Sequence, residues 1–385
     1  MSNKVKLQDY IQIQNGYAFK SNLFQNFGIP VVRITNVENG KLNLDKVVYY
    51  SEDKKLDRFI IKKNDILLSL TGDDKTLKVC MNDSDEKIYL NQRVAILRSN
   101  ESLIQKYLYY SIKKYSSLIL EKAKGIAQKN ISVDDINSLE VPLPSIEKQK
   151  QIAKTLDKAN ELIELRKESI TKLDALAKSI FIDMFGDPVS NPKGFEIKKL
   201  KDLTTKITDG THKTPIYKDK GIIFLSAKNV KNETLNLDNC KYISLEEHQQ
   251  LIKRCNPEYL DILLTKSGSI GMCALVPQFN FEFSVFESLC LIKFDKQKTN
   301  PFFLKNLLNS EAIKSQYKQV TKGIAIKHLH LIDIKNLDII YPPIELQNKF
   351  AKIIEKIEEQ KSLYEKELEK LQINFDALLQ KSFQE

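Results

Sequence analysis

Residues 124–154 read KGIAQKNISVDDINSLEVPLPSIEKQKQIAK, and residues 322–352 read KGIAIKHLHLIDIKNLDIIYPPIELQNKFAK. The two stretches align without a gap and are identical at 14 of 31 positions. Upstream, residues 28–51 match residues 221–244 at 11 of 24 positions. A long internal repeat sets the architecture before any local pattern does. Because the offset of 193 to 198 residues is the size of a domain, the sequence predicts a tandem duplication with a pseudo-two-fold axis.

Each copy ends in a long segment with a helical pattern. Residues 146–184 contain neither glycine nor proline and stop before Gly186. Apolar or tolerated positions recur at spacings of four and three, the heptad pattern of a coiled coil. In the first copy they are Ile152, Leu156, Ala159, Ile163, Arg166, Ile170, Leu173, Ala177, Ile180 and Met184. In the second copy, after two prolines, they are Leu346, Phe350, Ile353, Ile357, Gln360, Tyr364, Leu368, Leu371, Phe375 and Leu378.

The second seam contains one irregularity, because the spacings on both sides of Tyr364 are four residues. Such a stutter locally unwinds a coiled coil. Each helix is predicted to run about 39 residues, or roughly 58 Å at 1.5 Å per residue. We expect the two helices to pack antiparallel and to act as a ruler between two globular heads. The alternative is that each helix packs only on its own domain.

These patterns divide the chain into globular parts at 1–145 and 191–343, each followed by a helical segment, at 146–190 and 344–385. Within the globular parts, Asp-Ile-Leu-Leu predicts a buried strand in each copy, at 65–68 and 261–264. Residues 90–97 and 285–292 predict paired strands. Residues 104–120 and 301–317 predict helices whose aromatic side chains lie in the core. Strands and helices in mixed order favour the α+β class.

The net charge of +10 is unevenly distributed. The segments 1–145 and 191–343 carry +5 and +7, whereas the helical segments carry 0 and −2. Two basic heads on a neutral frame are typical of a protein that binds a polyanion. A generic basic protein, with lysine serving solubility, is the alternative. Arginine is scarce, with 6 residues against 54 lysines, and the second head has only Arg254. That head is therefore expected to rely on lysine, amide and hydroxyl groups and on DNA shape.

Composition excludes several classes of protein. Neither a basic-plus-apolar leader nor an apolar run of about 18 residues is present, so we expect a cytoplasmic protein that is neither secreted nor membrane-spanning. The five cysteines form no C-x-x-C spacing, which favours a reducing compartment. Four scattered histidines predict no metal centre.

The two copies agree in their frame and differ in their loops. Gln12–Ser21 stands against Ile207–Pro215, and each loop carries an Asn-Gly or Asp-Gly turn beside lysine and hydroxyl groups. Loops on a rigid frame commonly carry recognition, although an ordinary surface turn is the alternative at each position. The candidate DNA-binding residues are Asn15, Tyr17, Lys20, Arg33, Asn36, Lys75, Arg93, Lys129, Thr211, His212, Lys213, Lys228, Asn229, Ser269 and Lys327.

Catalytic motifs are missing from the sequence. It has no G-x-x-x-x-G-K-[ST] phosphate loop and no G-x-G-x-x-G fingerprint. Tyr341-Pro342-Pro343 resembles part of a methyltransferase motif but follows Ile340, where an amide or carboxylate would be needed. Asp73-Asp74-Lys75 is the nearest approach to a nuclease site and has no counterpart in the second copy. Four histidines support no Ser/His/Asp arrangement. We therefore predict a binding protein with no catalytic residue of its own.

The order of domains and helices resembles the specificity (S) subunit of type I restriction–modification systems, over essentially the whole chain. The distinctive stretches are Asn64-Asp65-Ile66-Leu67-Leu68, Gly125–Ile131 (GIAQKNI), Val141-Pro142-Leu143-Pro144 with Glu147-Lys148-Gln149, and Met184–Pro188 (MFGDP) with Asn191–Phe195 (NPKGF). Phe195 stands where tryptophan is common in the family, and the second copy has Ile326-Lys327-His328 where the first has Gln-Lys-Asn.

This resemblance implies a non-catalytic subunit that binds a bipartite site on double-stranded DNA, with one half-site for each recognition domain. It implies two modification subunits, which bind S-adenosylmethionine and methylate adenine. It also implies restriction subunits that use ATP and Mg²⁺, so this chain itself would bind no cofactor.

Two other kinds of protein remain open from the residues alone. One is a duplicated coiled-coil adaptor whose basic heads bind RNA or protein. The other is the recognition half of a single-chain methyltransferase–nuclease, against which the missing motifs argue. Duplex binding would weaken steeply with salt and would favour one sequence over others, and this behaviour separates it from the adaptor.

Overall fold

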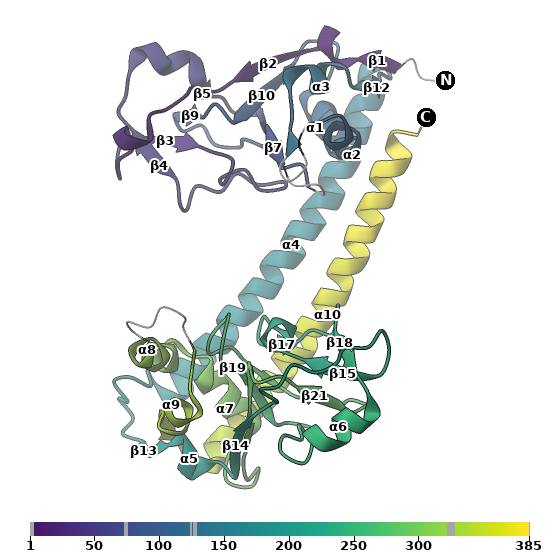
Figure 1. Cartoon of the computed structure of the whole chain (residues 1–385). Coiled ribbons are helices and arrows are strands. Elements are labelled where there is room, and N and C mark those ends of the chain that lie inside the picture. Colours follow the sequence, from purple (N-terminus) through teal and green to yellow (C-terminus); the bar gives the residue numbers. More distant parts are fainter. Residues whose placement is uncertain (1–3, 73–75, 124, 126–128, 322–327, 385) are drawn as a thin grey trace. The chain divides into compact units, whose positions relative to one another are not determined.

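The computed structural model describes the chain except for residues 1–3, 73–75, 124, 126–128, 322–327 and 385 (Figure 1). The chain forms two compact units. Unit 1 consists of Met1–Lys167 with Lys366–Glu385, and unit 2 consists of Glu168–Glu365. Both long helices therefore contribute residues to both units.

Unit 1 contains two four-stranded sheets. The first is antiparallel and has the order β2 (Ile11–Asn15), β10 (Val94–Ser99), β6 (Ile66–Ser69), β8 (Val79–Met81). The second has the order β4 (Val48–Tyr50), β3 (Ile29–Val32), β9 (Ile88–Leu90), β5 (Ile60–Ile61), and in it β3 and β9 run parallel. Two further strand pairs are β1 (Lys4–Lys6) with β12 (Glu140–Pro142) and β7 (Thr71–Gly72) with β11 (Lys129–Asn130).

Unit 2 repeats this plan with small differences. Its antiparallel sheet has the order β14 (Lys206–Asp209), β22 (Leu289–Lys293), β19 (Ile262–Thr265), β20 (Cys273–Leu275). Its second sheet has three strands, β18 (Lys241–Ile243), β15 (Ile222–Leu225) and β21 (Phe283–Val285), and the last two run parallel. The shorter pairs are β13 (Glu196–Lys199) with β23 (Asp338–Tyr341) and β16 (Val230–Lys231) with β17 (Thr234–Leu235).

Short helices complete each unit. In unit 1 they are η1 (Leu7–Asp9), η2 (Ser21–Leu23), η3 (Lys54–Phe59), α1 (Gln105–Lys114), α2 (Ser116–Lys122) and α3 (Val133–Asn137). In unit 2 they are α5 (Leu200–Leu203), η4 (Ala227–Asn229), α6 (Leu245–Leu251), α7 (Pro301–Leu308), α8 (Glu311–Val320) and α9 (Leu331–Lys335). The predicted α+β class is confirmed.

The Asp-Ile-Leu-Leu repeat forms a buried strand in each unit, as predicted, and this strand lies in the interior of its four-stranded sheet. In unit 1, Ile66 and Leu68 of β6 face the core that includes α1, whereas Leu67 joins Val32 and Leu90 on the other face. Successive side chains of a strand point to opposite faces, so a strand buried on both sides must be apolar throughout. Strand β19 repeats this arrangement in unit 2.

Two local predictions are corrected by the structure. Residues 90–97 and 285–292 are not single paired strands, because a turn interrupts each stretch; β10 pairs with β2 and β6, and β22 with β14 and β19. The predicted helices 104–120 and 301–317 are likewise each divided in two. The break in unit 2 follows Asn309, whose side chain donates to the Cys273 carbonyl (3.0 Å), and Ser310 then caps α8.

The long helices match their predicted extents. Helix α4 covers Ile146–Phe185 and helix α10 covers Ile344–Ser382. Helix α4 ends at Gly186, which has a φ of +75° and so provides the left-handed residue common after a helix. The first predicted seam is buried or half-buried throughout. In the second seam, the prediction for Ile353 is wrong, because this residue is 38% exposed. Its neighbour Ile354 is 2% exposed and packs in the core.

Within each unit the two helices run antiparallel, as expected. In unit 1 the first half of α4 packs with the last part of α10, and Arg166 pairs with Glu367 at 2.8 Å. In unit 2 the second half of α4 packs with the first part of α10, and Lys361 pairs with Asp174 at 2.6 Å. Phe181 and Phe185 meet Phe350 at ring-centroid distances of 5.5 and 5.3 Å.

Candidate nucleic-acid interface

One short turn in unit 1 joins β9 to β10 and forms hydrogen bonds to residues at or just beyond the ends of two other strands. We call residues 91–93 the β9–β10 turn. The amide of Asn91 donates to the carbonyl of Val32, where β3 ends (3.0 Å), and the amide of Gln92 donates to the carbonyl of Tyr17, just after β2 (2.9 Å). The loops that follow β2 and β3 therefore meet at this turn.

Unit 2 has the same turn between β21 and β22, at residues 286–288. The amide of Phe286 donates to the carbonyl of Leu225, where β15 ends (2.8 Å), and the amide of Glu287 donates to the carbonyl of Thr211 (3.0 Å). Three more backbone hydrogen bonds of the first turn each have a counterpart in the second. The bond from Tyr17 N to Leu90 O corresponds to that from Thr211 N to Val285 O, and the bond from Val94 N to Asn91 O corresponds to that from Leu289 N to Phe286 O. The bond from Leu70 N to Arg93 O corresponds to that from Lys266 N to Ser288 O.

Four sequence-predicted residues of unit 1 lie on the strands or loops bonded to this turn. Asn15 ends β2, Arg93 belongs to the turn, and both are exposed. Tyr17 is exposed on one side and packs its ring edge-on against Phe19 at 5.0 Å. Lys129 pairs with β7, which follows β6. Together these residues offer amide, phenol, guanidinium and ammonium groups, which suit contacts with bases and phosphates.

In unit 2 the corresponding loop carries Thr211, His212 and Lys213. The Thr211 hydroxyl accepts from the Lys213 amide (3.2 Å), which fixes a tight turn beside the β21–β22 turn. His212 and Lys213 are exposed. Ser269 is exposed in the turn after β19, and its carbonyl accepts a hydrogen bond from Thr265.

A buried charge cluster anchors this loop. Asp209 is 3% exposed, and its carboxylate contacts Lys266 Nζ (2.5 Å), His212 Nε2 (3.2 Å) and the guanidinium of Arg254. Burial is the largest influence on the pKa of Asp209 and acts to raise it. The hydrogen bond and charge of Lys266, with the charges of His212 and Arg254, outweigh burial and lower the pKa below its usual value. The loop thus begins at a carboxylate that stays ionised.

Sequence reasoning missed this cluster. Asp209 corresponds to Asn15, because Asp209 pairs with Cys290 as Asn15 pairs with Ala95. Lys266 corresponds to Leu70 through its backbone hydrogen bonds. The signal available in the sequence was the joint appearance of Asp209 and Lys266 at positions that are uncharged in the first copy.

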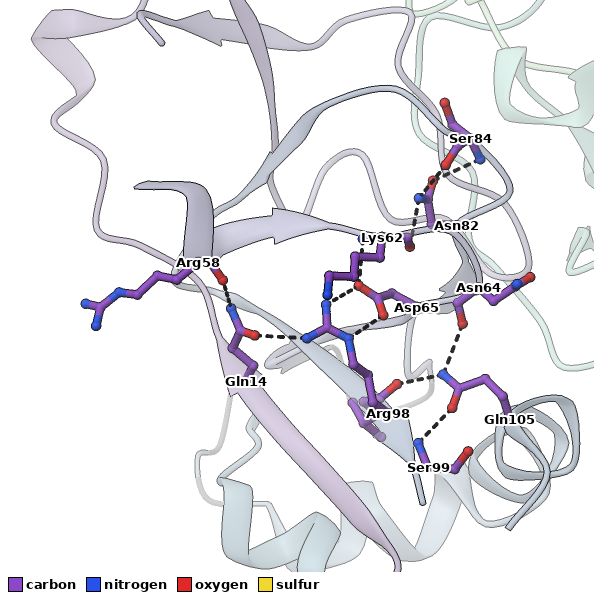
Figure 2. A network of polar contacts seen from close by, with 11 residues as sticks. Gln14, Arg58, Lys62, Asn64, Asp65, Asn82, Ser84, Arg98, Ser99 and Gln105 are labelled. Atoms are coloured by element: carbon purple, nitrogen blue, oxygen red, sulfur yellow. Dashed lines mark hydrogen bonds and ion pairs between the residues drawn. The ribbon is translucent and has the colours of Figure 1, made fainter. Parts of the chain in front are cut away.

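A second buried pair is shared by both units and is structural. Figure 2 shows the Arg98 guanidinium directed at both oxygens of Asp65 (2.6 and 2.5 Å) and at the side chain of Gln14 (3.2 Å). In unit 2, Lys293 contacts Asp261 at 2.5 Å in the corresponding place. Burial is the largest influence on the pKa of Asp261 and raises it, although Lys293 opposes the shift. A planar guanidinium satisfies both carboxylate oxygens, which an ammonium does not.

Cations also lie over aromatic rings in each unit. The guanidinium of Arg33 lies 5.8 Å from the ring centroid of Phe24, and Lys241 Nζ lies 5.2 Å from that of Tyr217. Phe24 and Tyr217 precede corresponding bridges, Gln25 to Tyr49 and Lys218 to Tyr242. Arg58 stacks on Phe59 at 4.6 Å. Such pairs hold a cation in place while leaving its donors free for phosphate.

The remaining predicted residues lie in other surroundings. Asn36 is buried, accepts from the Arg33 amide (3.0 Å) and donates to the Asn43 carbonyl (3.1 Å). Asn229 is also buried and makes the matching hydrogen bonds: it accepts from the Ser226 amide (2.9 Å) and donates to the Asn236 carbonyl (3.2 Å). Both amides are thus occupied within the fold. Lys20 and Lys228 are exposed, and Lys75 and Lys327 lie outside the described residues.

A hydrogen-bonded Ser–His–Glu arrangement occurs where the sequence predicted no such triad. His248 Nδ1 lies 2.9 Å from Ser284 Oγ, and Nε2 lies 3.2 Å from Glu282 Oε2. Ser284 is fully buried, so its hydroxyl does not reach solvent. Among the described residues, no group of three or more His, Cys, Asp or Glu could hold a metal ion. None of the helices in the same part of the chain combines the length and the hydropathy that a membrane-spanning segment requires.

The comparisons with known proteins agree on one family. Residues 2–175 and 192–372 match the type I restriction modification DNA specificity domain. The chain is 24% identical over 386 residues to the type I restriction enzyme EcoBI specificity subunit of Escherichia coli, covering 92% of this chain and 78% of that protein. It is 26% identical over 313 residues to the type I restriction enzyme MjaIX specificity subunit of Methanocaldococcus jannaschii, covering 76% and 71%.

A solved structure has the same fold. The type I restriction–modification system S subunit from M. genitalium matches with a TM-score of 0.58 at 18% identity, covering 100% of this chain and 96% of that one.

Proposed function

The chain belongs to the type I restriction modification DNA specificity family, and from this we propose that it reads a bipartite site on double-stranded DNA, one half-site with each unit. The observation that carries the proposal is the duplicated turn. The β9–β10 and β21–β22 turns share five backbone hydrogen bonds but differ in all three side chains, Asn-Gln-Arg in one and Phe-Glu-Ser in the other. A common frame with different side chains suits the reading of two different half-sites.

The charge supports duplex binding at these turns. Exposed or stacked cations near them include Arg93, Arg58, Lys213 and Lys241. Contacts to phosphate position a protein on DNA, and contacts to base edges give sequence preference. Arg93 is suited to guanine through a bidentate contact, and Asn15 is suited to adenine.

The proposal extends to partners. Two modification subunits, carrying S-adenosylmethionine, would assemble on this chain, and restriction subunits using ATP and Mg²⁺ would join them. The exposed apolar residues of the long helices, among them Leu162, Leu176 and Ile373, suit helical partners. This chain would act in the cytoplasm and supply recognition, with the chemistry left to the partners.

Selection from a random duplex library, using this chain co-purified with its modification subunits, tests the proposal. We expect enrichment of two short motifs at a fixed separation and binding that weakens steeply between 50 and 200 mM salt, as counterion release requires (~10³-fold or more for six to ten phosphate contacts). An unenriched library, or equal competition by RNA, would instead indicate the coiled-coil adaptor.

A further inference from the structure

We propose that Gln92 and Glu287, at matching positions of the two turns, are base-reading residues with different targets. Gln92 would read adenine, and Glu287 would read the exocyclic amino group of cytosine. The inference rests on the proposed function and assigns two residues within it.

The backbone geometry makes the two positions equivalent. Each residue is the middle one of its turn, and each donates its amide to the residue two places after β2 or β14, at 2.9 Å from Gln92 to Tyr17 and 3.0 Å from Glu287 to Thr211. The flanking hydrogen bonds described above hold the turn on both sides. A side chain carried on a rigid frame loses little freedom on binding, which favours specific readout.

The side chains differ in what they offer. The carboxamide of Gln92 is exposed and has a donor and an acceptor, the pair that adenine presents in the major groove. Glu287 has acceptors only and is 29% exposed. The amino group of cytosine is the donor that a carboxylate recognises in that groove. The same place in the two units therefore selects different bases.

An acidic side chain in this setting needs a reason. Glu287 belongs to the globular part 191–343, which carries a charge of +7. Beside DNA its own negative charge would oppose phosphate binding unless a base donor compensates. The ion pair that the structure gives it is with Nδ1 of His212, at 3.5 Å. The His212 side chain is 58% exposed and that of Glu287 is half-buried, so solvent screens the pair and its contribution to stability is modest. Recognition of cytosine gives the carboxylate a role beyond this pair.

The charge cluster acts as the positioning device. Asp209 is held by buried Lys266 and contacts Nε2 of His212, while Nδ1 of the same ring faces Glu287. The imidazole thus links a fixed carboxylate to the proposed reading carboxylate. Unit 1 has Asn15 and Leu70 in place of Asp209 and Lys266, and its turn carries the neutral Gln92.

Reciprocal exchange tests the assignment in the assembled complex. We would express Glu287→Gln and Gln92→Glu chains with the modification subunits and map methylated adenines in host DNA. Glu287→Gln should alter one position of one half-site, shifting the preference from cytosine toward adenine by about 5- to 150-fold. Gln92→Glu should make the opposite change in the other half-site. Should one variant fail to assemble, the other still tests its own half-site.

Glu246→Gln is the matched control, since Glu246 is an exposed carboxylate of unit 2 that lies on α6. Helix α6 follows the end of β18, which pairs with the start of β15, whereas the turn contacts the other end of β15. It should leave the motif unchanged. Normal methylation of an unaltered motif by both exchange variants would overturn the assignment and leave the proposed function intact. A wild-type complex that methylates no split motif would overturn the proposed function itself.

Discussion

At the residue scale, the buried charge pairs are of two kinds, one common to both units and one found in a single loop region. The Asp65–Arg98 pair and its counterpart Asp261–Lys293 occur in both units and stabilise the sheets. The Asp209–Lys266 pair occurs only in unit 2 and anchors a loop. A repeat alignment can locate the shared pair, but the distance between Asp209 and Lys266 depends on strand order, which sequence spacing does not supply.

Asp65→Asn should destabilise unit 1 by about 3–5 kcal/mol, because it leaves the Arg98 guanidinium (26% exposed) without its carboxylate. Asp85→Asn is the control, since Asp85 pairs with Lys63 at the surface and should cost under about 1 kcal/mol. Denaturant unfolding of both variants measures the difference. Equal losses would contradict a structural role for the Asp65 pair.

The depressed pKa of Asp209 predicts a pH dependence. A carboxyl with a lowered folded pKa stabilises the fold above its unfolded pKa, about 3.9, and loses that contribution as the pH falls through the folded value. Asp209→Asn removes the contribution and leaves buried Lys266 unpaired. The variant should therefore be less stable than wild type at neutral pH, with a gap that narrows below about pH 4. Thermal unfolding across pH measures this gap, and a constant gap would contradict the assignment.

At the element scale, periodicity predicted the long helices well and the short elements less well. A heptad seam extends over many turns, so the extents of α4 and α10 followed from proline, glycine and spacing alone. The turns at 91–93 (Asn-Gln-Arg) and 286–288 (Phe-Glu-Ser) lie between apolar segments and contain neither glycine nor proline, so each stretch resembles a continuous strand. A local hydrogen bond closes each turn, from Val94 N to Asn91 O and from Leu289 N to Phe286 O. Further bonds to neighbouring loops hold each turn in place, and a local sequence pattern does not show these.

The corrected seam gives a direct comparison of neighbours. Ile354→Ala should cost about 2–5 kcal/mol, because it opens a cavity beside the core of unit 2, whereas Ile353→Ala on the exposed side should change stability by about 0.5 kcal/mol or less. Urea unfolding of the two variants measures both values. A larger loss for Ile353→Ala would restore the originally predicted seam.

The ruler hypothesis concerns the stutter in α10. Deleting four residues between Ser362 and Leu371 shortens the helix by about 6 Å and should change the accepted DNA spacer by about one to two base pairs. A map of modified sites for the deletion variant tests this. An unchanged spacer, with the complex intact, would show that helix length does not set the gap.

At the scale of the whole molecule, the duplication is the feature on which the proposed function depends. Two units with one framework, a net positive charge in each globular part and different turn residues suit the proposed reading of two half-sites that need not match. The repeat and the family resemblance could be recognised in the sequence because both depend on residue identity along the chain. The positions that we propose to read bases could not be selected from the sequence, since they depend on which loops the sheets bring together.

The map of methylated adenines in host DNA, made with the wild-type chain and its modification subunits, tests the central claim most directly. The account predicts a split motif with two different half-sites at one fixed gap. A continuous motif, or a single half-site without a partner, would contradict it.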